Sequence, residues 1–117
     1  MKQILLCVAL AATALAAQGQ NDSSAPRKIE LTARKFEFSP GRIEVKVGET
    51  VEIAATSLDS KHGFECKDLK IEKVTFEPNK PATIRFTASR AGTYQFKCAN
   101  YCGSGHGRMK GEIVVAP

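Results

Sequence analysis

The sequence predicts an all-β domain, an antiparallel sandwich of seven to eight short strands. Three observations support this fold class. Apolar and polar residues alternate with a period of two over several short stretches, turn-forming dipeptides separate these stretches, and no long helical periodicity occurs after residue 16. Alternation of this kind is typical of strands with one buried face, and many short, evenly spaced strands are typical of sandwiches.

Residues 1–16 have the properties of a secretory signal peptide. Lys2 precedes an apolar run over residues 4–15, and Ala14-Leu15-Ala16 matches a small-x-small cleavage pattern. The run is shorter than the roughly 20 residues that cross a bilayer. We therefore expect a periplasmic or secreted protein, with no stable membrane span unless the signal is retained as an anchor.

The exported part is expected to start with a flexible leader over residues 17–27, because this segment is polar and ends in a proline and an arginine. The domain then covers residues 28–117, which is one domain's worth of chain. The whole chain has a net charge of +5, and removal of Lys2 with the signal lowers it to +4. These charges alternate with acids and form no basic cluster, so we expect no nucleic-acid partner.

The first half of the domain contains three alternating segments. Residues 29–33 alternate between apolar and polar side chains, and Phe36 and Phe38 continue the apolar stripe one register later. Residues 43–47 and 51–55 alternate in the same way. Turns are expected between them, at Pro40-Gly41 and at Gly48-Glu49.

The second half predicts the remaining strands and their turns. The segments are residues 63–66, 71–77, 82–88, 93–98 and 111–115, with turns at Pro78-Asn79 and Ala91-Gly92. Cys66 falls in the shortest of these segments, where we expect it to be a small buried apolar residue.

The segment between the last two expected strands carries the residues with distinctive chemistry. It reads Cys98-Ala-Asn-Tyr-Cys102-Gly-Ser-Gly-His106-Gly-Arg-Met109, with spacings of four, four and three. Soft sulfur donors together with imidazole suit copper, and the three glycines allow a tight loop. The other histidine of the chain, His62, precedes a short strand, where a sandwich can present it beside this loop.

Other interpretations remain open on these residues alone. Loss of Cys7 with the signal leaves three cysteines, so at least one is unpaired within a monomer. Cys98 and Cys102 would form a disulfide in a purely structural sandwich. With His62 and His106 they would also form a Cys₂His₂ zinc set, although zinc gives Met109 no role.

Three parts of the sequence together resemble the CuA cupredoxin domain, which occurs in cytochrome c oxidase subunit II and at the C-terminus of nitrous-oxide reductase. They are Asp59-Ser-Lys-His62-Gly-Phe64, the segment from Phe86 to Tyr94, and the loop C-x₃-C-x₃-H-x₂-M. The resemblance covers most of the mature chain and is strongest over residues 59–115. It implies a cupredoxin-like Greek-key sandwich that carries electrons and is not itself an enzyme.

The resemblance also implies a ligand set for a binuclear copper centre, with two coppers per chain. Cys98 and Cys102 would bridge the two ions as thiolates, and His62 and His106 would each cap one of them. Met109 would be a weak axial ligand. The backbone carbonyl of Asn100 would complete the second ion; the family usually has Glu at this position, but a carbonyl ligand tolerates the change of side chain.

The chain departs from the oxidase domains in two respects. It contains no Trp, whereas those domains use a tryptophan near the site for electron entry, and its mature part is basic where theirs are often acidic. The resemblance implies a redox partner such as a c-type cytochrome or a respiratory complex, and the charge favours an acidic one. Alternative functions are a copper chaperone or storage protein on the same fold, or a mononuclear copper site.

Overall fold

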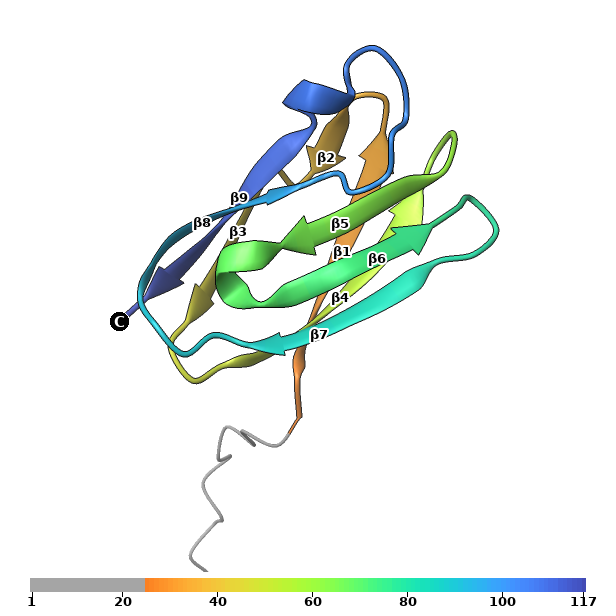
Figure 1. The fold of residues 1–117 in the computed structure, drawn as a ribbon. Helices are drawn as coiled ribbons and strands as arrows, with labels where there is room; N and C mark the ends of the chain where they lie inside the picture. Colours follow the sequence, from red (N-terminus) through yellow and green to blue (C-terminus); the bar gives the residue numbers. More distant parts are fainter. Residues whose placement is uncertain (1–24) are drawn as a thin grey trace, which may run out of the picture.

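The computed structural model describes residues 25–117, so the expected signal peptide and most of the expected leader lie outside the described residues. The first strand starts at Arg27. Nine strands follow one another along the chain (Figure 1). They are β1 (Arg27–Arg34), β2 (Glu37–Ser39), β3 (Arg42–Lys46), β4 (Thr50–Ser57), β5 (His62–Cys66), β6 (Ile71–Phe76), β7 (Ala82–Thr87), β8 (Gly92–Lys97) and β9 (Lys110–Ala116).

The strands form two sheets, which confirms the predicted β-sandwich. One sheet has four strands in the order β2-β1-β4-β7, and the other has five in the order β3-β9-β8-β5-β6. Two short 3₁₀ helices, Lys67–Leu69 and His106–Arg108, interrupt the loops. No helix within residues 25–117 is long and apolar enough to span a membrane.

The sheets are not purely antiparallel as expected, because β1 pairs with β4 and β3 pairs with β9 in parallel. The cause lies at Pro40-Gly41, which was expected to be a turn. There the chain passes from β2 in one sheet to β3 in the other without reversing direction. The reversal comes instead at Gly48, whose φ of 85° suits a tight turn, and β4 therefore returns parallel to β1.

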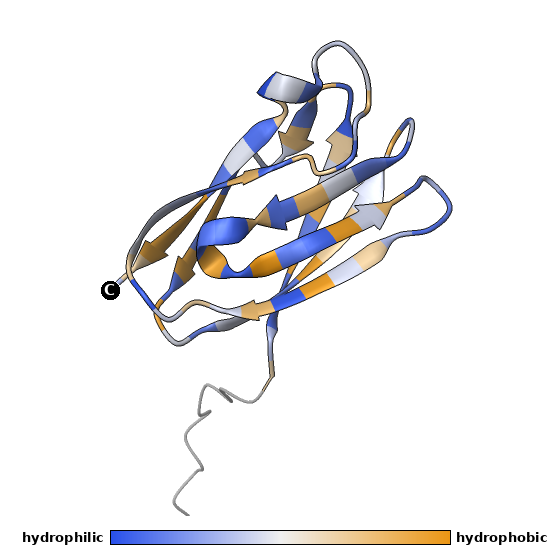
Figure 2. Ribbon diagram, in the orientation of Figure 1, coloured by the Kyte–Doolittle hydropathy of each residue, from blue (hydrophilic) through white to orange (hydrophobic). Residues whose placement is uncertain are grey.

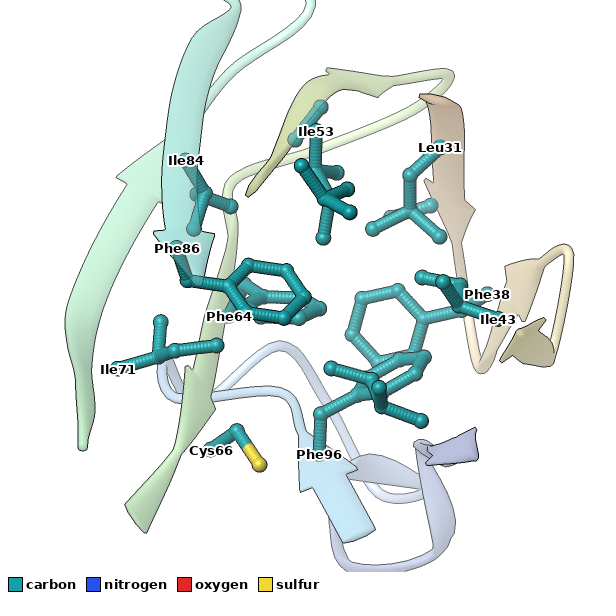
Figure 3. Close-up of a cluster of buried hydrophobic side chains, with 14 of the residues drawn as sticks. Leu31, Phe38, Ile43, Ile53, Phe64, Cys66, Ile71, Ile84, Phe86 and Phe96 are labelled. Carbon is teal, nitrogen blue, oxygen red and sulfur yellow. The ribbon is translucent and has the colours of Figure 1, made fainter. Parts of the chain in front are cut away.

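The core lies between the two sheets and follows the predicted alternation (Figure 2). In β3, for example, Ile43 and Val45 are buried and their neighbours are exposed. Phe64 and Phe96 stack with ring centroids 4.7 Å apart, and Phe38 packs edge-on against Phe96 at 5.1 Å (Figure 3). Cys66 lies in this core at 1% exposure, as its sequence position predicts.

Three connections meet at one end of the sandwich. They are the β1–β2 turn, the β4–β5 loop and the long β8–β9 loop (Figure 1). The Lys35 N–H donates to Asp59 at 2.7 Å, which links the first two, and the Asn100 side-chain N–H donates to the Lys61 carbonyl at 3.3 Å, which links the last two. We call this end of the molecule the metal-binding end, for the reasons given next.

Candidate metal centre

The β8–β9 loop is anchored at its two ends. The Cys98 N–H donates to the Met109 carbonyl at 3.0 Å, which continues the β8–β9 pairing beyond both strands. Cys98 is 2% exposed and Met109 is fully buried, so both side chains point into the molecule. The Cys98 sulfur also accepts the Gly63 N–H of β5 at 3.4 Å. The loop is therefore fixed to the five-stranded sheet on either side of its ten intervening residues.

The donor atoms predicted from the sequence converge around the two cysteines. The Sγ atoms of Cys98 and Cys102 lie 3.9 Å apart. His62 Nδ1 lies 3.9 Å from Cys98 Sγ, and His106 Nδ1 lies 3.6 Å from Cys102 Sγ. Each thiol thus faces one imidazole. The donor atoms of His62, Cys98 and Cys102 all lie within 4.8 Å of one another, and no second group of this kind occurs in residues 25–117.

Two further donors lie at the edges of this group. The Met109 Sδ is 3.7 Å from Cys102 Sγ. The backbone carbonyl oxygen of Asn100 is 3.2 Å from Cys98 Sγ. All six residues singled out in the sequence therefore lie in one place, with the two sulfurs at the centre and one neutral donor beside each.

His62 is held in one orientation by Asp59. The His62 ring is fully buried, and its Nε2 lies 2.7 Å from Asp59 Oδ1. Asp59 also accepts the N–H groups of Lys35 at 2.7 Å and Ser60 at 2.6 Å. Burial raises the pKa of this carboxyl, but the hydrogen bonds from Lys35, His62 and Ser60 outweigh that effect and lower its pKa to about 2.

The ionised Asp59 fixes the tautomer of His62. An ionised carboxylate can only accept hydrogen bonds, so the His62 Nε2 carries the proton. In the neutral imidazole the Nδ1 atom is then unprotonated, faces Cys98, and is available as a ligand. A carboxylate behind a histidine is the usual way in which proteins orient an imidazole toward a metal. Asp59 was part of the sequence motif, but its role in orienting His62 was not predicted. The spacing D-x-x-H is the sequence feature from which this role could have been recognised.

The Cys102 thiol is poorly disposed to ionise in the absence of a metal. Burial, followed by the neighbouring Cys98 and by Asp59, raises its pKa to about 11, and the charge of Lys35 opposes the shift.

The distance between the two loop cysteines shows that they do not form a disulfide, because a disulfide needs sulfurs about 2.05 Å apart. At 3.9 Å the two cysteines are free thiols, and Cys66 is a free buried thiol as well.

The shape of the loop depends on Phe36, which the sequence did not single out for this purpose. The Phe36 ring packs against the backbone of Gly103 and Gly105. A Cβ at position 103 would lie 2.9 Å from the ring, and one at position 105 would overlap it more severely. Gly107, by contrast, faces open space. Of the three glycines expected to permit a tight loop, two are needed for close packing and the third is not.

Comparison with known proteins shows the family to which the chain belongs. A family model described as a cupredoxin-like domain matches residues 5–115. Cytochrome c oxidase subunit 2 of Thermus thermophilus is 38% identical over 87 residues, which are 74% of this chain and 64% of that protein. Nitrous-oxide reductase of Cupriavidus necator is 24% identical over an alignment of 91 residues that covers 74% of this chain and 14% of that protein. The chain thus spans less than two thirds of the length of these relatives.

Solved structures show the same architecture. A chain of a heme-copper terminal oxidase dimer has a TM-score of 0.68 and 29% identity, covering 80% of this chain and 67% of that one. The periplasmic domain of oxidase subunit II from Bradyrhizobium japonicum has a TM-score of 0.71 and 19% identity, and the match covers 79% of this chain and 85% of that one. At this identity the similarity supports the fold alone. The chain belongs to the cupredoxin-like domain family and is related to cytochrome c oxidase subunit II.

Proposed function

We propose that this protein is an exported electron carrier whose metal-binding end holds two copper ions in a CuA-like centre. The observation that carries the proposal is the pairing of the two thiols. Their sulfurs lie 3.9 Å apart, and each faces the Nδ1 of a different histidine at 3.6–3.9 Å. Two thiolates placed between two imidazoles suit a pair of ions bridged by sulfur, whereas one ion needs only one of the cysteines in a blue-copper arrangement.

The residues have distinct roles in this proposal. Cys98 and Cys102 would hold the ions through their thiolates, and His62 and His106 through their Nδ1 atoms; the Met109 sulfur and the Asn100 carbonyl would complete the ligand set. When bound, the copper pair would supply a one-electron redox couple. The chain itself contributes a donor set that is buried at His62, Cys98 and Met109 and half-buried elsewhere. It also contributes a His62 ring fixed by Asp59 and a loop fixed at both ends, so that little needs to move when the charge of the site changes.

Zinc is less well supported than copper by the same contacts. A Cys₂His₂ set would satisfy zinc without any thioether. Here the Met109 sulfur lies 3.7 Å from Cys102 and is fully buried in the donor cluster. A soft thioether in that position favours copper over zinc.

The proposed cellular setting is supported by the N-terminal sequence and by the relatives. Residues 1–16 have the properties of a secretory signal peptide, and matched relatives are named as subunits of cytochrome c oxidases. We infer that this protein works in the periplasm or outside the cell, and that it exchanges electrons with a c-type cytochrome or a respiratory complex. It acts as an electron-transfer module, and any oxidase or reductase reaction would belong to such a partner.

Substitution of the ligands tests the assignment. In copper-loaded protein, His62→Ala and Cys102→Ser should each abolish the binuclear spectrum or convert it to that of a single copper, since the first removes a ligand from one ion and the second removes a thiolate that both ions share. Cys66→Ala serves as the matched control, because Cys66 is also a buried cysteine but lies in the core away from the cluster. If His62→Ala and Cys102→Ser kept the wild-type spectrum, the ligand assignment would be wrong.

A further inference from the structure

The surface over the metal-binding end combines exposed apolar side chains with positive charge. Within residues 25–117 three large apolar side chains are well exposed: Tyr101 at 76%, Leu58 at 60% and Val47 at 42%. Tyr101 and Leu58 both lie on the loops of the metal-binding end, whereas Val47 follows β3 at the other end. Exposed apolar residues surrounded by polar ones are a feature of interaction sites.

The Tyr101 ring packs against His106, one of the proposed ligands. Its ring centroid is 5.5 Å from that of His106, and the His106 Nδ1 is 3.6 Å from Cys102 Sγ. A protein that covers Tyr101 is therefore separated from the donor cluster by two side chains. Because electron transfer slows steeply with distance, this is the face at which a redox partner gains most by docking.

The acids at this end are already engaged. Asp59 is bonded to His62 and to the backbone of the two adjoining loops, and Glu65 pairs with Lys97 at 3.5 Å. Glu37 pairs with Arg34, and Glu77, which follows β6 at the same end, pairs with Lys80 at 3.9 Å. Each of these acids is thus paired with a cation or, in the case of Asp59, bonded to N–H groups of the same end.

Three cations at the same end remain available to a partner. Lys35, Lys61 and Arg108 are exposed and form no ion pair with any residue of the described part of the chain. Arg108 is held in place by the Phe36 ring, with its guanidinium carbon 5.3 Å from the ring centroid, a distance typical of a cation–π contact. No acidic residue occurs between Lys97 and Glu112. The surface that covers the centre is therefore positive.

We propose that these five residues, Lys35, Leu58, Lys61, Tyr101 and Arg108, form a docking surface for an acidic electron-transfer protein. We call it the Tyr101 rim. Tyr101 and Leu58 supply its apolar contacts, and the three cations steer a negatively charged partner toward it. One electron passes across the contact, so that one protein is oxidised as the other is reduced, and no bond is made or broken. The inference rests on the proposed function and adds where the partner binds and what its charge is.

The experiment measures electron transfer from the reduced, copper-loaded full chain by stopped-flow absorbance. The probes are two c-type cytochromes, one of net negative and one of net positive charge, and two one-electron oxidants of opposite charge, hexacyanoferrate(III) and tris(phenanthroline)cobalt(III). The variants are Lys61→Glu and Arg108→Glu. Lys46→Glu, at the far end of β3, is the matched control, because it changes the net charge equally.

We expect each rim variant to slow the reaction with the acidic cytochrome and with hexacyanoferrate(III) by roughly threefold to tenfold, and to speed the reaction with the cationic probes. The wild-type reaction with the acidic cytochrome should slow as salt is added. Tyr101→Ala should slow that reaction too, and Tyr101→Phe should preserve it. The Lys46→Glu control should behave as wild type.

Three results would overturn the proposal. One is an equal effect of Lys46→Glu, which would show that only net charge matters. Another is wild-type rates in both rim variants with an intact copper spectrum, which would leave the proposed function standing and remove the rim. The third is binding to phosphatidylglycerol vesicles that the rim variants lose while their rates stay unchanged, which would assign the cations to a membrane. If the wild-type chain showed no copper spectrum at all, the proposed function and the rim would both fail.

Discussion

Asp59 is an exposed residue, but its hydrogen bonds connect two loops and orient His62. It is bonded at once to the backbone of the β1–β2 turn, to its own loop, and to His62 Nε2. It therefore sets both the position of the loops and the tautomer of a ligand. Outer residues of this kind tune metal affinity because an imidazole free to rotate or to change tautomer must be ordered again on binding.

Asp59→Asn should weaken copper binding by roughly tenfold or more, because a neutral amide no longer fixes the Nε2–H tautomer of His62. Competition with a copper chelator measures the change. Asp68→Asn is the control, since it removes the same charge from an exposed 3₁₀ helix remote from the donors. Equal copper affinities in the two variants would contradict the role given to Asp59.

The residues proposed as ligands are easier to recognise in the sequence than the residues that support them. Cysteine, histidine and methionine at fixed spacings within one loop are visible along the chain, and all of them converge in the structure. Phe36 is separated from the loop by more than 60 residues, so its contact with Gly103 and Gly105 could not be seen in any local pattern. Only the fold brings them together.

At the scale of elements, the β8–β9 loop depends on packing against the β1–β2 turn. Gly105→Ala should place a methyl group in the space that the Phe36 ring fills. Overpacking of this kind costs about 1–3 kcal/mol, so the metal-free variant should unfold at lower urea concentration and hold copper less well. Combining it with Phe36→Ala should restore part of the copper binding.

Gly107→Ala is the matched control for that substitution, because no atom lies within 4 Å of the added carbon. Its stability should lie within about 0.5 kcal/mol of wild type, as for most surface changes. If both alanine variants were equally stable, the Phe36 contact would not determine the loop.

The strand pattern itself was largely predictable, because period-two alternation records which face of each strand is buried. Eight strand segments were expected. In the structure a turn at Lys35–Phe36 divides the first of these segments into β1 and β2, which gives nine strands in the described residues. The sheet assignment was not predictable in the same way. Pro40-Gly41 has turn-forming residues, but whether the chain reverses there or crosses to the opposite sheet depends on the pairing of β1 with β4, which is a long-range contact.

At the scale of the whole molecule, the core links stability to pH through Cys66. Burial, the largest influence, raises the pKa of this thiol above its usual value of 9.0. The unfolded chain then loses the Cys66 proton at a lower pH than the folded one. Cys66 accordingly favours the folded state fully below pH 9, and this contribution is lost as pH rises above 9.

The metal-free wild type should therefore lose stability between neutral pH and about pH 10 more steeply than Cys66→Ala does. Urea unfolding of both proteins over this range measures the difference, and Cys98 and Cys102 affect both proteins alike. Parallel stability profiles would show that the Cys66 thiol is not protected by the core.

The proposed function treats the whole molecule as a carrier of one electron shared by two copper ions. The most direct test is copper content combined with an electron paramagnetic resonance spectrum of the protein reconstituted with copper. We expect two coppers per chain and one unpaired electron with hyperfine coupling to both copper nuclei. A single copper per chain with coupling to one nucleus, or no copper with Cys98 and Cys102 joined as a disulfide, would contradict it.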